Sequence, residues 1–215
     1  MTHASLFATP AGPPAFVPFA PGPQDWPVLH SALELPGLTP RFTLRRHPSF
    51  VQGDASPLLE SADEWAQDFS FADPATGRSA RLDISCTRLL AESLARFRTG
   101  LEGVVAGLGR SIAKSFGGAI EGTRSFLAVG LQAAETRLSG SRRTAGNIEE
   151  AMFGIYRAVI ADDMLFVVSF TSYYPSREAS DGGYTPLVNP LLKECGLPAL
   201  DSLTFGFRAE GTAAD

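Results

Sequence analysis

The sequence predicts an α+β fold: an antiparallel sheet packed against one long and one short helix, with a Pro-rich N-terminal arm. Residues 65–88 alternate apolar and polar side chains on both sides of a turn, a pattern typical of a β-hairpin. Residues 151–174 predict a second hairpin, in which the first strand is apolar on both faces and the second strand has one strongly apolar face. Residues 89–122 repeat apolar side chains at spacings of three and four, which indicates one face of a long helix. A short segment at 186–195 is followed by Gly196, which is a common helix-ending residue.

Three regions are expected along the chain: an extended arm at 1–40, a single domain at 41–208 and a frayed tail at 209–215. The first 27 residues hold seven of the 16 prolines. Proline fixes φ and lacks a backbone N–H, so this segment is excluded from helix and central strand. Because the arm also carries apolar side chains, we expect it to lie across its own domain, with docking on a partner or second subunit, or disorder, as alternatives.

Further strands and loops complete the expected fold. The alternation of side chains predicts strands at 41–46, 126–138 and 202–207. Clusters of Gly, Ser, Asp and Asn predict polar loops at 139–147 and 175–185.

The 151–174 hairpin contains the most apolar strand of the chain. One of its faces is strongly apolar and carries Phe166, Val168 and Phe170, whereas the other face is mixed. We expect these three residues to form either the core or the platform that receives a partner, and the sequence leaves both open. Tyr173 and Tyr174 follow at the end of the strand and could line a recognition surface.

A row of small residues follows the long predicted helix at intervals of four, including Gly103, Gly107 and Ser111. An interior glycine destabilises a helix by roughly 1 kcal/mol relative to alanine. Another backbone is therefore expected to pack closely on this row. That backbone would belong either to the sheet of the same domain or to a helix of a partner. A break of the helix near Gly107–Gly109 is a further alternative.

Composition excludes several classes of protein. A net charge of −5 leaves no basic footprint for nucleic acid. No uncharged apolar run reaches 18 residues, so a membrane-spanning helix is not expected. The N-terminus lacks the pattern of a secretory signal, which favours a soluble cytoplasmic protein. Cys86 and Cys195 are expected to be free, buried and structural.

No catalytic or cofactor motif is complete. Residues 111–114 match the SxxK pattern of serine hydrolases, but the companion elements are missing. Residues 107–109 lack the third glycine of a dinucleotide fingerprint, and no Walker-type lysine follows a glycine-rich loop. We therefore expect no catalytic residue and no cofactor.

Metal and anion sites are not indicated either. The three histidines lie in the first quarter of the chain without metal-ligand spacing, so no metal site is expected. Asp162 and Asp163 suit a solvated hairpin turn better than a carboxylate pair. Arg142 and Arg143 are more typical of a solvated loop than of an anion-binding site.

The order of elements resembles the PsbP/Mog-like α+β sandwich, and within it the Eag-type chaperones of type VI secretion effectors. The likeness rests on LDISCTRL at 82–89, YRAVIADDMLFVVSFTS at 156–172 and LTFGFR at 203–208. The resemblance implies a non-enzymatic binding protein, often a dimer, that shields hydrophobic helices of a client protein.

The leading expectation is therefore a binding or adaptor protein with a protein partner and a possible homodimer. Two alternatives stay open. One is a small-ligand carrier or enzyme with a pocket between helix and sheet, and the other is an immunity-type or structural interaction protein.

Overall fold

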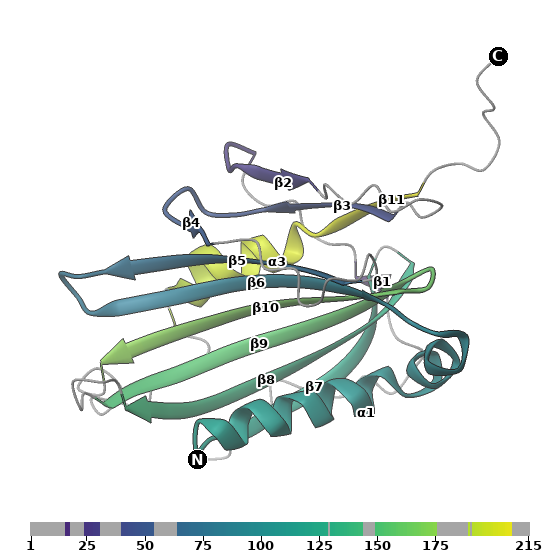
Figure 1. Cartoon of the computed structure of the whole chain (residues 1–215). Coiled ribbons are helices and arrows are strands. Elements are labelled where there is room, and N and C mark those ends of the chain that lie inside the picture. Colours follow the sequence, from purple (N-terminus) through teal and green to yellow (C-terminus); the bar gives the residue numbers. More distant parts are fainter. Residues whose placement is uncertain are drawn as a thin grey trace.

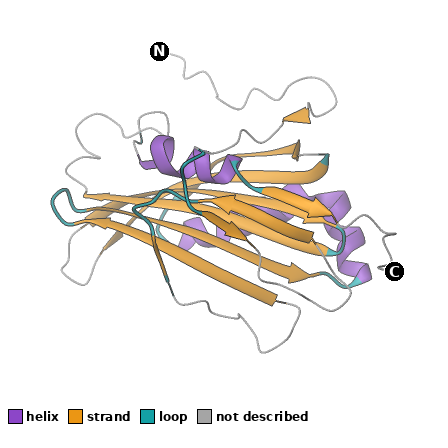
Figure 2. Cartoon of the chain, turned by 90° about the horizontal axis from the view of Figure 1, so that it is seen from above, coloured by secondary structure: helices purple, strands orange, loops and turns teal. Residues whose placement is uncertain are grey.

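The computed structural model describes residues 16–17, 24–30, 40–53, 64–128, 130–143, 149–175, 189 and 191–207. These residues form an eight-stranded sheet, a three-stranded sheet and two helical segments (Figure 1). Viewed from above, the strands of the large sheet run side by side, with helix on both sides of it (Figure 2).

The large sheet has the strand order β1-β7-β8-β9-β10-β6-β5-β4. Its strands are β1 (Phe16–Val17), β4 (Val51–Gln52), β5 (Glu64–Asp73), β6 (Arg78–Arg88), β7 (Ala119–Ala128), β8 (Leu131–Arg143), β9 (Glu149–Ala161) and β10 (Met164–Pro175). All neighbours pair antiparallel except β1, which joins the outer edge of β7 in parallel.

Both predicted hairpins are confirmed, and local turn chemistry explains them. In the β5–β6 turn, the Asp73 carboxylate accepts hydrogen bonds from the Ala75 N–H and the Thr76 hydroxyl, and Gly77 has a φ of +68°. In the β9–β10 turn, Asp162 has a φ of +54°, a region that Asp tolerates better than most residues. The turn at Asp162–Asp163 therefore lies where the sequence placed it.

Helix α1 (Ala91–Ser115) connects β6 to β7 and lies mainly over β7 and β8 (Figure 1). Its buried side consists of Leu101, Val105, Gly109 and Ala113, which recur at intervals of four. The predicted long helix is confirmed in type but ends earlier than residue 122. Gly117 has a φ of +60° and its N–H bonds the Lys114 carbonyl, so the helix is capped and the chain turns into β7.

The opposite face of the large sheet is covered by the C-terminal elements and the small sheet. A π-helical turn, η1 (Leu192–Gly196), continues directly into α3 (Leu197–Asp201). The small sheet has the order β11-β3-β2, formed by β11 (Thr204–Phe207), β3 (Pro40–Arg45) and β2 (Val28–His30). Phe42, Leu192 and Leu200 from these elements join Phe166 and Phe170 of β10 in the main core.

The predicted α+β class is wrong, because the described chain is mostly β. The patterns predict helix for residues 119–122 and no element for residues 123–125, yet all of them lie in β7. The single strand predicted at 126–138 is also wrong, because these residues span the end of β7 and most of β8, which pair with each other as a hairpin. The predicted loop at 139–147 is strand as far as Arg143. These segments are strands because β7 pairs with β8, and β8 pairs with β9. Pairing of this kind can override the local propensity of a segment. Helix covers only part of one sheet face and a short stretch of the other.

Of the other predicted elements, two strands and the short helix are present, with shifted ends. The strands predicted at 41–46 and 202–207 appear as β3 and β11, paired with each other. The short helix is confirmed in type but runs from 191 to 201 instead of 186–195. Gly196 does not end it, because this residue has helical backbone angles and the helix continues to Asp201. Residues 176–185, 208–215 and most of the arm lie outside the described residues. Among the described helices, none is long and apolar enough to cross a membrane.

Candidate functional site

The helix-side face of the large sheet is divided into a part beneath α1 and a part beyond it. α1 packs on β7, β8 and β9, where Leu101 and Val105 contact Ala134, Ala158 and Ile160. The side chains of β10, β6 and β5 on the same face lie beyond the main contacts of α1. We call this part the open strip. It comprises Leu165, Val167, Ser169, Thr171 and Tyr173 of β10, Arg81, Asp83, Ser85 and Thr87 of β6, and Glu64, Ala66, Asp68 and Ser70 of β5. Ser169 and Thr171 are only 5% and 4% exposed, whereas the other residues of the strip are partly or fully exposed.

Two carboxylates share one cation in the middle of the open strip. Asp68 and Asp83 are directly opposed across β5 and β6. The Arg81 Nε lies 2.6 Å from Asp83 Oδ1, and its Nη2 lies 3.8 Å from Asp68 Oδ2. Burial raises the pKa of Asp83 although Arg81 opposes this effect. Like charges opposed across a ladder are destabilising, so this position would favour a further cation.

Apolar and aromatic side chains occupy both ends of the strip. Leu165 and Val167 are half-buried and, like Phe97 of α1, pack against the cluster that Leu101 and Val105 form with the sheet. Tyr173 is half-buried at the other end, next to Tyr156 of β9. Burial raises the pKa of Tyr156, whose hydroxyl lies 3.4 Å from the Thr171 hydroxyl. The strip therefore combines apolar contact area with a central negative charge.

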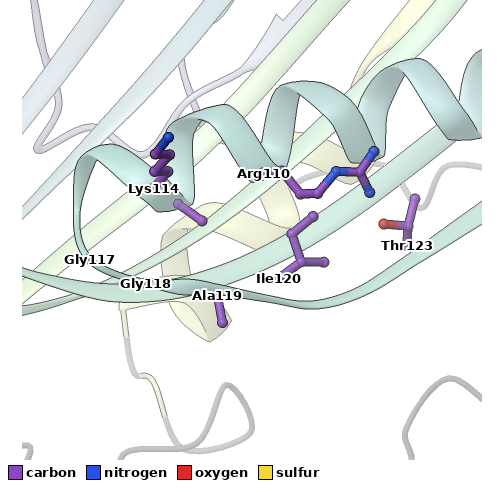
Figure 3. Close-up of a pocket in the computed structure, with 8 residues that line it drawn as sticks. Arg110, Lys114, Gly117, Gly118, Ala119, Ile120 and Thr123 are labelled. Atoms are coloured by element: carbon purple, nitrogen blue, oxygen red, sulfur yellow. The ribbon is translucent and has the colours of Figure 1, made fainter.

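A second candidate is an open pocket of about 540 Å³ between the last turns of α1 and the start of β7, which we call the α1–β7 groove (Figure 3). Arg110 and Lys114 of the helix line it, and the strand contributes residues up to Thr123. In Figure 3, Arg110 extends over the groove toward Thr123, whereas Lys114 lies one turn along the helix and points away from Ile120.

A buried charge cluster lies on the other face of the sheet and is structural. Glu135 is fully buried, and its Oε2 accepts hydrogen bonds from Arg157 at 2.8 and 3.0 Å. Burial raises the pKa of Glu135, but Arg157, Arg124 and Arg137 together hold it below its ordinary value. Arg157 also donates to the Leu200 carbonyl and to Asp201, each at 2.9 Å. The cluster therefore fastens α3 to the sheet.

The strongest predicted site residues are core residues. Phe166, Val168 and Phe170 are at most 1% exposed, because α3, η1 and the small sheet cover their face. The platform interpretation of these three residues is wrong. Tyr174 is also buried and bonds Asn189 through its hydroxyl. Tyr173 alone of the predicted β10 residues reaches the open strip.

The small-residue row of α1 faces away from the sheet. Gly103 and Ser111 are exposed, and a Cβ added at Gly103 would meet no atom within 4 Å. At Gly107 such a Cβ would meet only the Arg110 side chain, at 3.9 Å. The sheet of the same domain therefore does not pack on this row, and that interpretation is wrong. Contact with a partner helix there stays a prediction.

Sequence reasoning missed the open strip although its signal was visible. The predicted hairpins already showed Asp68 alternating with Phe69, and Asp83 with Ile84. Within β10, Val167, with Ser169, lies on the mixed side of the strand. A mixed face marks partial exposure, whereas a fully apolar face marks the core. The hydrophobicity of Phe166, Val168 and Phe170 therefore marks a buried face and not a binding surface.

The two cysteines and the turn aspartates, which the sequence also singled out, do not form a site. Cys86 and Cys195 are buried and are not joined in a disulfide, as expected. Burial raises the pKa of the Cys195 thiol to about 11, with a smaller contribution from Glu194. Asp163 of the β9–β10 turn pairs with Arg88 at the end of β6, at 3.7 Å. Within the described ranges, no group of three or more metal-ligating side chains could hold an ion.

Comparison with known proteins gives little further direction. No family model matches the chain, and no curated protein matches it. One similar solved structure is LpqN of Mycobacterium tuberculosis, described as involved in cell envelope biogenesis. That match has 13% sequence identity and a TM-score of 0.46, and it covers 84% of this chain and 91% of that one. A likeness at this level supports no inference about function.

Proposed function

We propose that this protein is a non-enzymatic binding module that receives an amphipathic helix of a protein partner on the open strip. The observation that carries the proposal is the division of the helix-side face. α1 takes the places over β7, β8 and β9, and no other described helix packs on the same side of β10, β6 and β5. A second helix laid beside α1 would complete the layer.

The dimensions of the open strip fit one helix. Three strands at a spacing of about 4.8 Å present a face about 14 Å wide, and a helix with its side chains is about 10 Å across. From Leu165 to Tyr173 the strip is about 27 Å long, at about 3.4 Å per residue. A helix of about 18 residues matches that length.

The chemistry of the open strip selects the partner. Leu165 and Val167 offer apolar contact, so the partner helix needs apolar residues at helical spacing. Asp68 and Asp83 outnumber Arg81, so Lys or Arg on the partner would relieve the opposed carboxylates. The proposed partner is therefore an amphipathic helix with apolar and basic residues. In the form implied by the Eag-type resemblance, it belongs to a secreted client that the protein shields in the cytoplasm.

A peptide titration tests this function. Three helical peptides of about 18 residues serve as probes: one of Leu and Lys at helical spacing, one of Leu and Glu, and a scrambled Leu/Lys sequence. Binding is followed by amide chemical shifts in the ¹⁵N-labelled protein. We expect the Leu/Lys peptide to shift residues of β10, β6 and β5 and to bind about tenfold more tightly than the Leu/Glu peptide.

Matched variants separate the strip from the rest of the surface. Val167→Glu should abolish binding, whereas Leu108→Glu, which places the same charge on a 39% exposed leucine of α1, should not. Asp68→Asn with Asp83→Asn should remove the preference for Lys over Glu. Equal affinity for the scrambled peptide, or shifts outside the strip, would contradict the proposal. If the protein is a dimer that Val167→Glu dissociates, the open strip binds a second copy of this chain and not a helix of another protein.

A further inference from the structure

We infer that the α1–β7 groove binds a phosphate or carboxylate group carried on a small apolar body, with Arg110 as its principal contact. The groove lies on the far side of α1 from the open strip, so this site is independent of the proposed function. It also fits the second class expected from the sequence, a ligand held between helix and sheet.

The two cations of the groove have no other role in the described structure. Arg110 and Lys114 are exposed and form no hydrogen bond or ion pair with a described residue. They stand one helical turn apart, and like charges at that spacing destabilise a helix by a few tenths of a kcal/mol. An anion between them would reverse the sign of that interaction.

Capping of the helix does not explain these cations. A basic residue in the last turn often compensates free carbonyls. Here the Ala113 carbonyl accepts from the Gly118 N–H at 2.8 Å, and the Lys114 carbonyl accepts from the Gly117 N–H at 3.3 Å. The Ile112 carbonyl accepts from the Ser115 hydroxyl at 2.7 Å. Arg110 precedes the last turn of the helix, and the effect of the helix end falls off within that last turn.

The remaining lining residues define the ligand. Thr123 is already bonded to the Thr136 hydroxyl at 3.0 Å, so the cations carry the recognition of charge. Ala113 and Ile120 form an apolar floor that suits a hydrocarbon body. Lys114 is exposed, and its flexible side chain would reach an anion in the groove by changing rotamer. Glu121 follows Ile120 on β7 but does not line the groove, so the lining itself is positively charged.

Titration with phenyl phosphate and with inorganic phosphate, at constant ionic strength, tests the site by amide chemical shifts. We expect both to shift residues 110–123, phenyl phosphate more tightly because of its ring. Arg110→Gln with Lys114→Gln should weaken binding about tenfold or more. The matched pair Arg96→Gln with Lys193→Gln, which removes two exposed charges elsewhere, should leave the affinity within about threefold.

Vesicles distinguish the source of the anion. Co-sedimentation with phosphatidylcholine vesicles that contain phosphatidylglycerol, lost in the Arg110→Gln/Lys114→Gln variant, would identify a lipid headgroup. Binding of soluble phenyl phosphate without vesicle binding would identify a free ligand. The inference is overturned if neither probe shifts residues 110–123, or if the matched pair weakens binding as much as the groove pair.

Discussion

Replacing glycines on opposite sides of α1 tests how the helix is oriented on the sheet. Gly103 faces away from the sheet, and a Cβ added there meets no atom within 4 Å. Gly103→Ala should therefore act only through helix propensity and raise the free energy of unfolding by about 0.8–1 kcal/mol. Gly107→Ala should have a similar effect, because its only neighbour is the flexible Arg110 side chain at 3.9 Å.

Gly109→Ala should have the opposite sign. A Cβ at Gly109 would lie 2.8 Å from Thr136 Cγ2 and 3.1 Å from Thr136 Oγ1. Thr136 is fully buried, and its hydroxyl is held by Thr123 and the Gly122 carbonyl, so it has little freedom to move. Overpacking of this kind costs about 1–3 kcal/mol. Both Gly103→Ala and Gly109→Ala gain about 1 kcal/mol from helix propensity, and only Gly109→Ala is overpacked. The free energies of unfolding of these two variants should therefore differ by about 1–3 kcal/mol.

Urea unfolding followed by circular dichroism measures both variants. An unchanged slope with urea concentration shows that the change lies in the stability of the same fold. If Gly103→Ala destabilises the protein, something packs on the small-residue row, and a second copy is the first partner to test by light scattering. If Gly109→Ala stabilises it, the orientation of α1 on the sheet is wrong.

Three further predictions concern the interior. Arg157→Met should lower the free energy of unfolding by about 3–5 kcal/mol in urea, because it leaves Glu135 buried without its main partner. Because the pKa of Glu135 is lowered in the folded protein, its ionised carboxylate stabilises the fold at pH values above 4.5, the ordinary pKa of this group. This stabilisation is lost as the pH falls through the pKa that Glu135 has in the folded protein. Glu135→Gln should therefore be less stable than wild type at pH 7 and converge with it in acid, and parallel pH curves would contradict this. Neither Cys86 nor Cys195 should react with a thiol reagent at pH 8 before unfolding, since both are buried.

The elements that were predictable from the sequence are those that local chemistry decides. The β9–β10 turn follows from two adjacent aspartates, and the β5–β6 turn follows from Asp73 and Gly77. Residues 101–113 of α1 follow from apolar spacing. Each of these signals lies within a few residues of the feature that it predicts.

The fold class and the site depend on contacts between distant parts of the chain. Residues 119–125 become strand because β8 pairs with them, and Ile120 also fits the apolar row of the preceding helix. The side of α1 that faces the sheet carries Leu101, Val105 and Gly109, and Gly109 lies close against Thr136. The more conspicuous row at Gly103 and Gly107 is on another side of the helix. Which face of β10 is covered depends on elements at both ends of the chain.

The central claim is that the helix-side face is open over β10, β6 and β5. Ala134 and Val167 lie on the same cross-strand row, the first fully buried beneath α1 and the second half-buried in the open strip. Maleimide labelling of Ala134→Cys and Val167→Cys variants, each checked for wild-type stability, compares the two positions directly.

We predict that Val167→Cys is labelled about tenfold faster or more, and that the Leu/Lys peptide slows its labelling but not that of a cysteine at Leu108. Equally slow labelling of the two sheet positions would show that the open strip is covered, and it would contradict the account.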